Sequence, residues 1–143
     1  SPAYLKEHGA PSSPEDLPAH RCVNFMSNRN GRIVDWEFVR DGRKIELSLK
    51  GVLAVNEFDA YVVAGVMGLG IIKVANYVVQ THLESGQLKQ VLADWTSELL
   101  PISVMYPKGR HLSPKVRVFI EWVSELFQRN PLLKPLPAVS RRK

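Results

Sequence analysis

The chain has 143 residues and a mass of 16.1 kDa, the size of one domain or of one domain with an appendage. A single cysteine, Cys22, excludes a scaffold stapled by internal disulfides, and the longest uncharged apolar run, residues 60–72, is too short to span a bilayer. The first residues show no signal-peptide pattern, and the chain does not begin with Met, so we expect part of a longer protein.

The net charge of +5 resides mostly in the C-terminal tail. Four of the 19 basic residues lie beyond residue 130, which leaves 15 basic and 14 acidic residues in residues 1–130. A surface that binds duplex DNA should not be nearly neutral, so the charge argues against a nucleic-acid module and leaves only a local basic patch as an alternative.

Two short helices are predicted at the start of the chain. Residues 1–10 form a helix or turn that ends at Gly9, and Ser13 caps a second helix with Pro14 at its first position. The apolar alternation of residues 21–25 then predicts a strand.

A β-hairpin is the strongest local signal. Residues 36–39 and 44–49 alternate polar and apolar around Asp41-Gly42, a dipeptide that favours a two-residue turn. Residues 51–55 continue as a more buried strand.

Helices and strands alternate in the rest of the chain. Asn56 is predicted to cap a helix over 57–67 that Gly68 ends, and Gly86 ends a helix over 76–85. Further strands are predicted at 70–74, 88–92 and 101–106. This order indicates an α/β domain with a mixed sheet.

The clearest helix begins at Ser113-Pro114 and ends at Asn130-Pro131. Apolar residues form a stripe at helical spacing along it: Val116, Phe119, Ile120, Val123 and Phe127.

Candidate catalytic groups are few. His20 and Cys22 lie two residues apart, which on a strand would place both side chains on one face. A thiol–imidazole pair is one interpretation. The favoured one is a buried cysteine beside a helix-ending histidine, because no orienting third group is near in sequence. The four histidines are scattered and no carboxylate pair stands out, so we expect no metal site and no catalytic residues.

Two other features favour structural roles. Gly65, Gly68 and Gly70 follow a predicted helix and precede a predicted strand, the reverse of the order in a phosphate-binding loop. Five basic residues crowd one loop and the hairpin, where a solvated rim is the usual explanation and an anion-attracting mouth is the alternative: Arg29, Arg32, Arg40, Arg43 and Lys44.

Strand ends offer the best ligand site. Ligands of open α/β sheets bind beyond the carboxyl ends of strands, where helix-start amides suit anionic or polar molecules. Two predicted strands end in segments with polar side chains. From the residues alone, the favoured interpretation is that Ser27 forms a turn and Asn56 caps a helix, with no ligand involved. The segments are Phe25-Met26-Ser27-Asn28 and Val55-Asn56-Glu57.

Short motifs follow one another from residue 1 to about residue 127. Ser-Pro-Ala-Tyr-Leu opens the chain, and Pro-Glu-Asp-Leu and His-Arg-Cys-Val follow at 14–17 and 20–23. Val-Asn-Glu precedes Gly-Leu-Gly-Ile, and Gly-Gln-Leu precedes Trp95. The most specific motif is Leu-Ser-Pro-Lys-Val-Arg at 112–117. In this order and spacing they resemble the effector-binding domain of LysR-type transcriptional regulators.

The resemblance implies a regulatory domain like type 2 periplasmic binding proteins, with two α/β lobes and a small-molecule effector between them. Residues 1–100 would form the second lobe, a Rossmann-like mixed sheet flanked by helices. Residues 101–130 would supply a crossover strand and the C-terminal helix of the first lobe, and residues 131–143 a disordered tail. Without the rest of the first lobe, the apolar stripe would lack its usual partner and would favour association.

The resemblance also implies a cytoplasmic, non-enzymatic protein without a cofactor or a membrane, acting as a homo-oligomer (dimer or tetramer). DNA would be bound only by an N-terminal winged helix-turn-helix outside this sequence. Glu57 stands where the family often has Asp, and Ala75 where Pro is frequent. An extracytoplasmic solute-binding protein of the same fold is the alternative.

The residues that correspond to the family's effector site follow from this resemblance. Ser27 and Asn28 would donate hydrogen bonds, and Phe25 and Met26 would form an apolar wall. The backbone around three further residues would line the site: Asn56, Gly70 and Ile71.

Overall fold

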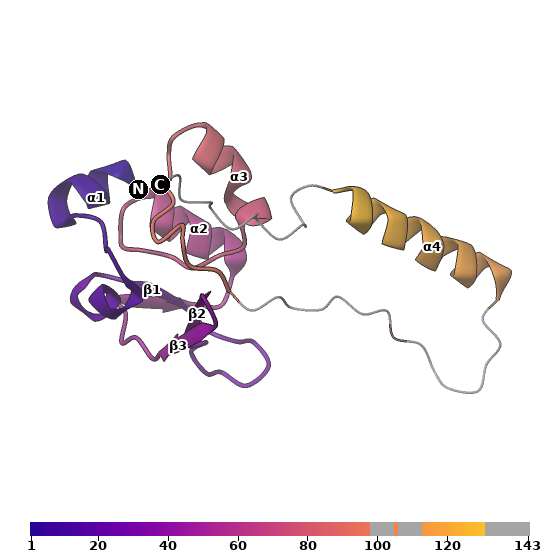
Figure 1. The fold of residues 1–143 in the computed structure, drawn as a ribbon, viewed down its shortest axis with the longest axis horizontal. Helices are drawn as coiled ribbons and strands as arrows, with labels where there is room; N and C mark the ends of the chain where they lie inside the picture. The colour runs from indigo at the N-terminus through magenta and orange to yellow at the C-terminus, as the bar shows by residue number, and fades with distance from the viewer. Residues whose placement is uncertain (98–104, 106–112, 131–143) are drawn as a thin grey trace. The chain divides into compact units, whose positions relative to one another are not determined.

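The structure, a computed structural model, describes residues 1–97, 105 and 113–130. The described residues up to Ser97 belong to one compact unit, and the last helix belongs to another (Figure 1). The elements are, in chain order, α1 (Pro2–His8), the 3₁₀ helix η1 (Pro14–Ala19), β1 (Val23–Phe25), β2 (Trp36–Arg40), β3 (Arg43–Leu47), β4 (Leu53–Val55), α2 (Phe58–Val66), α3 (Asn76–Glu84) and α4 (Pro114–Arg129).

The two N-terminal helices begin where the sequence predicts. The hydroxyl of Ser1 accepts a hydrogen bond from the backbone N–H of Tyr4 at 3.3 Å, and α1 ends at Gly9, whose φ is +76°. At the start of η1, the carboxylate of Asp16 accepts the N–H groups of Ser12 and Ser13 at 2.9 and 3.0 Å. These side chains satisfy helix-end donors that have no partner within the helix.

The described strands form two separate two-stranded sheets rather than one mixed sheet. β1 and β4 are parallel, whereas β2 and β3 form the predicted antiparallel hairpin. Asp41 and Gly42 turn the hairpin with φ angles of +50° and +77°, the backbone that an Asp-Gly turn favours.

Several predicted strands differ in the structure. The strand predicted at 70–74 is reduced to one parallel bridge between Ile71 and Cys22, and the strand predicted at 88–92 is wrong, because these residues form no strand. β4 was expected to be more buried, yet its first residue, Leu53, is 41% exposed. Met105 apart, the predicted strand at 101–106 lies outside the described residues, as does the tail at 131–143.

Helix α2 covers β1 and supplies much of the core. Tyr61 and Ala64 of α2 pack with Val23 of β1, and all three are at most 3% exposed. The helix ends before Gly68, the predicted stop, which has a left-handed backbone with a φ of +76°. A second core cluster joins α1, η1, the hairpin and the bridge: Tyr4, Leu17, Cys22, Trp36, Phe38, Leu49 and Ile71.

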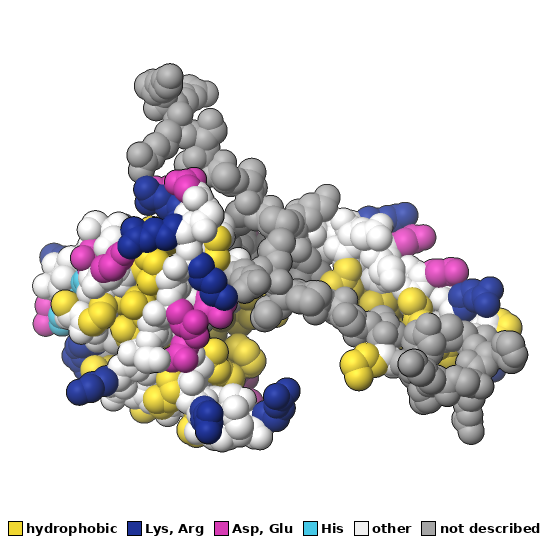
Figure 2. Space-filling model, turned by 60° about the horizontal axis from the view of Figure 1, so that its bottom comes forward, with side chains coloured by type: hydrophobic (Ala, Val, Ile, Leu, Met, Phe, Trp, Pro, Cys, Tyr) yellow, Lys and Arg dark blue, Asp and Glu magenta, His cyan; other side chains and the backbone are white. Residues whose placement is uncertain are grey.

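Helix α4 begins after Ser113, with Pro114 in its first turn, and ends at Asn130, as predicted. Its predicted apolar stripe is largely exposed, since Val116 is 43% and Phe119 is 60% exposed, and hydrophobic side chains line its surface (Figure 2). Within the described part of the chain, no helix has both the length and the apolar character needed to cross a membrane.

Candidate functional site

The carboxyl ends of β1 and β4 lie side by side. Parallel pairing places Phe25 opposite Val55, and the N–H of Met26 continues the pairing by donating to the Val55 carbonyl at 2.7 Å. The structure therefore brings together the two segments that the sequence nominated as a ligand site.

A pair of asparagines joins the two loops that follow these strands. Nδ2 of Asn56 donates to Oδ1 of Asn28 at 2.8 Å, and Nδ2 of Asn28 donates to the backbone carbonyl of Asn56 at 3.0 Å. Asn56 was predicted to cap α2, and this is wrong. Glu57 occupies the N-cap position, and its side chain makes no capping hydrogen bond. The Asn56 side chain instead faces the neighbouring loop, a partner 28 residues away.

Ser27 shapes the first of these loops. Its N–H donates to the Arg32 carbonyl at 2.9 Å, its carbonyl accepts the Gly31 N–H at 2.8 Å, and its hydroxyl accepts the Arg29 N–H at 3.3 Å. A hydroxyl that accepts one hydrogen bond can still donate its own proton. Ser27 is half-buried and remains a candidate donor to a ligand.

An aromatic wall adjoins the two loops. The Phe25 ring stacks on Phe58 with centroids 4.5 Å apart and meets Tyr61 edge-on at 5.7 Å. Phe58, the first residue of α2, is 53% exposed, and the sequence analysis did not nominate it. The sequence feature that could have indicated Phe58 is a large aromatic residue directly after a predicted helix start. Met26 is half-buried and forms an isolated bridge with Ile33.

Two nominated residues lie elsewhere. Ile71 bridges Cys22 at the amino end of β1, so it is about 10 Å from the strand's carboxyl end at 3.3 Å per residue. Ile71 is 9% exposed and belongs to the core. Gly70 lies against the backbone of Arg21, where a Cβ would clash. The structure thus does not bring Gly70 and Ile71 together with Phe25–Asn28.

Lys73 is a charged group that the sequence analysis passed over. Its N–H donates to the Tyr61 hydroxyl at 2.9 Å, and its ammonium lies 6.0 Å from the Phe38 ring centroid. Burial lowers the pKa of Lys73, and the nearby Glu37 opposes that shift. The signal in the sequence was the single charge that ends the apolar run at 60–72.

The thiol–imidazole interpretation is not supported. Sγ of Cys22 lies 3.6 Å from the Leu17 carbonyl, whereas Nδ1 of His20 lies 3.2 Å from the Tyr4 hydroxyl. Burial raises the pKa of Cys22 to about 11, so the thiol is protonated at neutral pH. Among the described residues, no group of three or more His, Cys, Asp or Glu side chains could hold a metal ion.

Parallel strands whose carboxyl ends carry polar loops beside an aromatic wall form the part of an α/β domain where ligands of such folds commonly bind. Residues 1–128 match the LysR substrate binding domain family, which covers most of the chain. The chain belongs to this family of regulatory, non-enzymatic domains.

A transcriptional regulator is similar to this chain in sequence. An HTH-type transcriptional repressor from Pseudomonas aeruginosa is 34% identical over 137 residues, which are 96% of this chain and 43% of the repressor. The chain therefore spans less than half of that relative.

Two solved regulatory domains share the fold. A cysteine-to-serine variant of the AphB regulatory domain from Vibrio vulnificus has a TM-score of 0.67 at 25% identity, covering 87% of this chain and 61% of that one. The CrgA regulatory domain from Neisseria meningitidis has a TM-score of 0.64 at 22% identity, covering 88% and 61%.

Proposed function

We propose that this chain is the effector-sensing part of a LysR-type transcriptional regulator and binds a small polar molecule at the carboxyl ends of β1 and β4. A winged helix-turn-helix elsewhere in the same cytoplasmic protein would bind DNA. The observation that carries the proposal is the Asn28–Asn56 pair, which connects two strand-end loops beside the Phe25–Phe58 wall.

The asparagine pair has hydrogen-bonding capacity to spare. Each side-chain amide nitrogen carries two N–H groups, and the hydrogen bond described for each nitrogen uses one of them. Both side chains are exposed, so a second N–H from each can reach a ligand. With the Ser27 hydroxyl, they form a set of donors that suits a ligand rich in acceptors, such as a carboxylate or a carbonyl compound.

The start of α2 favours the same chemistry. The first N–H groups of a helix lack partners within the helix and carry a partial positive charge. Helix α2 begins two residues after Asn56. Glu57 and Asp59 offset part of this field, so the donors themselves are the main source of selectivity in the proposal.

The proposal assigns residues 1–100 to the second lobe of the regulatory domain, and residues 101–130 to the crossover strand and a first-lobe helix, followed by a tail at 131–143. The boundary between the two compact units, which falls after residue 98, supports this division. Effector binding would then change the lobe arrangement only if the effector binds the two arrangements with different affinity.

A homo-oligomer of the intact regulator is part of the proposal. Val63 and Met67, one helical turn apart at the end of α2, are 58% and 74% exposed. Leu53 on β4 is also exposed, and among the described strands β4 pairs only with β1. Exposed apolar residues of this kind are typical of surfaces that associate.

A transcription reporter in bacteria tests the effector site, with the longer regulator that contains this chain. Asn28→Ala removes both hydrogen bonds of the pair, and we expect the response to effector to fall at least tenfold while binding to operator DNA is retained. Asn30→Ala is the matched control, because the Asn30 side chain is in the same loop but accepts its hydrogen bond from the nearby Arg32 N–H rather than from the Asn56 loop. An unchanged response in Asn28→Ala, with the same effector concentration dependence, would contradict the assignment.

A further inference from the structure

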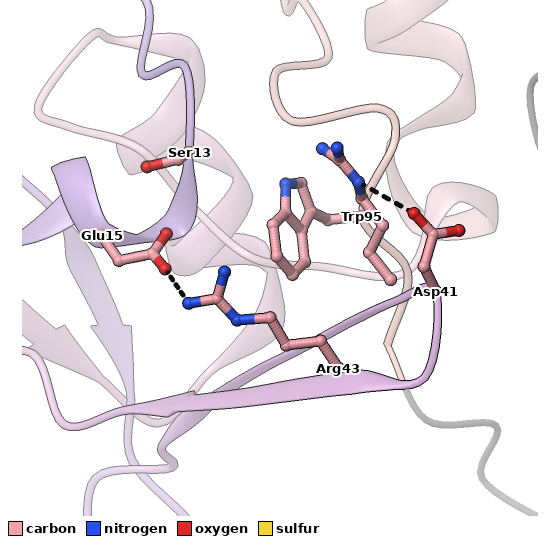
Figure 3. A pocket seen from close by; sticks show the side chains of 6 residues that line it. Ser13, Glu15, Asp41, Arg43 and Trp95 are labelled. Atoms are coloured by element: carbon pink, nitrogen blue, oxygen red, sulfur yellow. Dashed lines mark hydrogen bonds and ion pairs between the residues drawn. The ribbon is translucent and has the colours of Figure 1, made fainter. Parts of the chain in front are cut away.

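A pocket lies on a different part of the α/β unit from the strand-end loops. It is open to solvent, has a volume of about 460 Å³, and is formed by η1, the β2–β3 hairpin and the segment after α3 (Figure 3). The lining residues are Ser13, Glu15, Arg40, Asp41, Arg43 and Trp95. None of them was nominated for the effector site.

The pocket contains two positive and two negative side chains. Nη2 of Arg43 lies 2.7 Å from Oε1 of Glu15, and Nε of Arg40 lies 3.5 Å from Oδ2 of Asp41. A guanidinium has five N–H groups, so each arginine keeps donors beyond the one used in its ion pair. Hydrogen bonds from its own backbone N–H and from Ser13, together with Arg43, lower the pKa of Glu15, which is therefore ionised at neutral pH.

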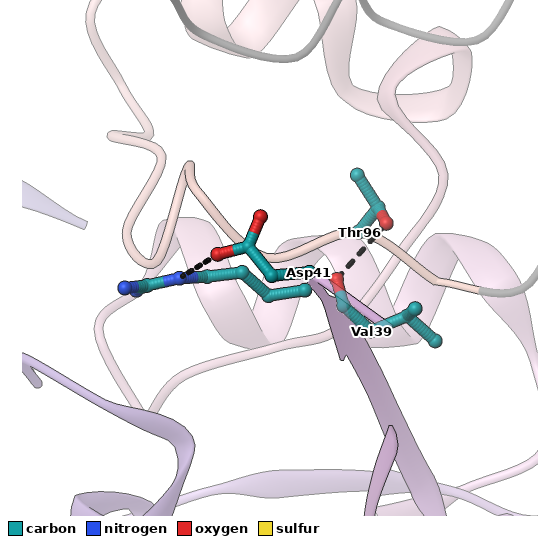
Figure 4. Close-up of polar contacts among 4 residues, drawn as sticks. Val39, Asp41 and Thr96 are labelled. Atoms are coloured by element: carbon teal, nitrogen blue, oxygen red, sulfur yellow. Dashed lines mark hydrogen bonds and ion pairs between the residues drawn. The ribbon is translucent and has the colours of Figure 1, made fainter. Parts of the chain in front are cut away.

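Trp95 is held in this pocket by its neighbours. The backbone N–H of Trp95 donates to the Leu92 carbonyl at 2.9 Å and closes a turn. The next residue, Thr96, exchanges backbone hydrogen bonds with Val39 at 2.8 and 2.9 Å, and its hydroxyl donates to the Val39 carbonyl at 3.1 Å (Figure 4). These hydrogen bonds hold the backbone that carries Trp95 against the edge of β2.

The indole nitrogen of Trp95 is buried and has no hydrogen-bond partner among the residues that the structure describes. The Arg40 guanidinium lies over the same ring, 5.2 Å from its centroid. Buried polar groups in folded proteins are nearly always paired, so this donor beside a charged pocket is free to bind an acceptor that a ligand brings.

We propose that this pocket binds a small zwitterion of the free amino-acid type. The ligand's carboxylate would accept from Arg40 or Arg43 and from the Trp95 indole, and its ammonium would lie against Glu15 or Asp41. A simple anion would place an unbalanced negative charge beside these two carboxylates. A simple cation would place an unbalanced positive charge beside the two arginines. Because the indole nitrogen is buried, binding moves the Arg40 side chain that covers the ring. This inference is independent of the strand-end effector site.

The probes are L-phenylalanine and two molecules that each lack one of its charged groups, 3-phenylpropionate and phenethylamine. Each is titrated into the ¹⁵N-labelled chain and followed by NMR of the indole N–H and backbone amides, with Trp95→Phe identifying the Trp95 indole signal. We expect phenylalanine to shift the Trp95 indole signal and the Asp41–Arg43 amides saturably. The other two probes should bind at least about tenfold more weakly, which corresponds to about 1.4 kcal/mol.

Variants test the two halves of the proposal separately. Arg43→Gln removes a guanidinium that would bind the ligand's carboxylate, and we expect phenylalanine binding to weaken at least about fivefold. Glu15→Gln should weaken phenylalanine binding but strengthen 3-phenylpropionate binding, because it removes a negative charge. Arg29→Gln, an exposed arginine outside the pocket, should leave binding unchanged. Backbone amide spectra of each variant show whether the fold is retained.

Three results would overturn the proposal. The first is the absence of a saturable shift of pocket signals at about 20 mM phenylalanine, well above a millimolar Kd. The second is 3-phenylpropionate binding as tightly as phenylalanine, which would indicate a simple anion site. The third is saturable shifts confined to Ser27, Asn28 and Asn56, which would place phenylalanine at the strand-end site and leave the effector proposal intact.

Discussion

In the α/β unit, Tyr61 is 1% exposed between α2 and β1, whereas Phe119 of α4 is 60% exposed. Both are aromatic residues on helices, but α2 is apolar on most sides, whereas α4 is strongly amphipathic. Tyr61 has a sheet to pack against within its own unit, and the apolar stripe of α4 faces outward in its unit. A sequence pattern can therefore specify a helix and its apolar face without specifying what covers that face.

The largest difference in the free energy of unfolding should be between a substitution in the core and a substitution in the apolar stripe of α4. Tyr61→Ala should lower the free energy of unfolding of the α/β unit by about 3–5 kcal/mol, because it leaves a cavity between α2 and β1. Phe119→Ala should change it by less than about 0.5 kcal/mol. Urea unfolding followed by tryptophan fluorescence measures both, in a Trp122→Phe background that removes the fluorophore of α4. Equal losses in the two variants would break the comparison.

Close backbone packing should have the next effect. In Gly70→Ala, the new Cβ would clash with the Arg21 carbonyl, which is backbone and cannot easily move. We expect a loss of about 1–3 kcal/mol in the same urea experiment. Gly65→Ala is the matched control, because its Cβ would meet the flexible side chain of Ile72. A larger loss for Gly65→Ala would contradict this account of the core.

Alkaline pH should destabilise the α/β unit. Burial raises the pKa of Cys22 to about 11 and that of Tyr61 to about 12. Both groups stay protonated in the folded state while the unfolded chain loses the protons, so their stabilisation is complete below about pH 9 and is lost as pH rises to about 12. Each such proton contributes about 1.4 kcal/mol per pH unit. Lys73, whose pKa is lowered, acts in the opposite direction up to its ordinary value near 10.5.

Urea midpoints at pH 8, 10 and 11 measure this effect. Cys22→Ala should reduce the dependence on pH, whatever its own cost in stability. Helix α4 contains neither Cys nor Tyr, so its helical circular dichroism should not follow the same curve. A flat profile for the α/β unit between pH 8 and 11 would show that Cys22 and Tyr61 are not buried as described.

The smallest effect should come from the strand-end loops. Asn28→Ala removes two hydrogen bonds at an exposed position, where each contributes about 0.5 kcal/mol, the low end of the usual range. We expect a loss of at most about 1 kcal/mol in the urea experiment. A loss comparable to that of Tyr61→Ala would mean that the asparagine pair supports the core rather than a ligand site.

The sequence predicted features that depend on neighbours along the chain. Gly9, Pro14 and Gly68 mark helix ends through backbone geometry and capping within a few residues, and Asp41-Gly42 determines its turn in the same way. The motif series also identified the family to which residues 1–128 belong. These are local or serial signals, and a single sequence contains them.

Tertiary structure decided which distant residues each of these local elements contacts. Asn56 is a reasonable helix cap in sequence, but it pairs with Asn28, which only the parallel β1–β4 pairing brings near. Residues 88–92 have a strand-like pattern and form no strand. Of the five crowded basic residues, Arg40 and Arg43 line a pocket with Glu15 and Trp95. Such partners lie tens of residues apart, and their proximity follows from chain packing that local propensity does not encode.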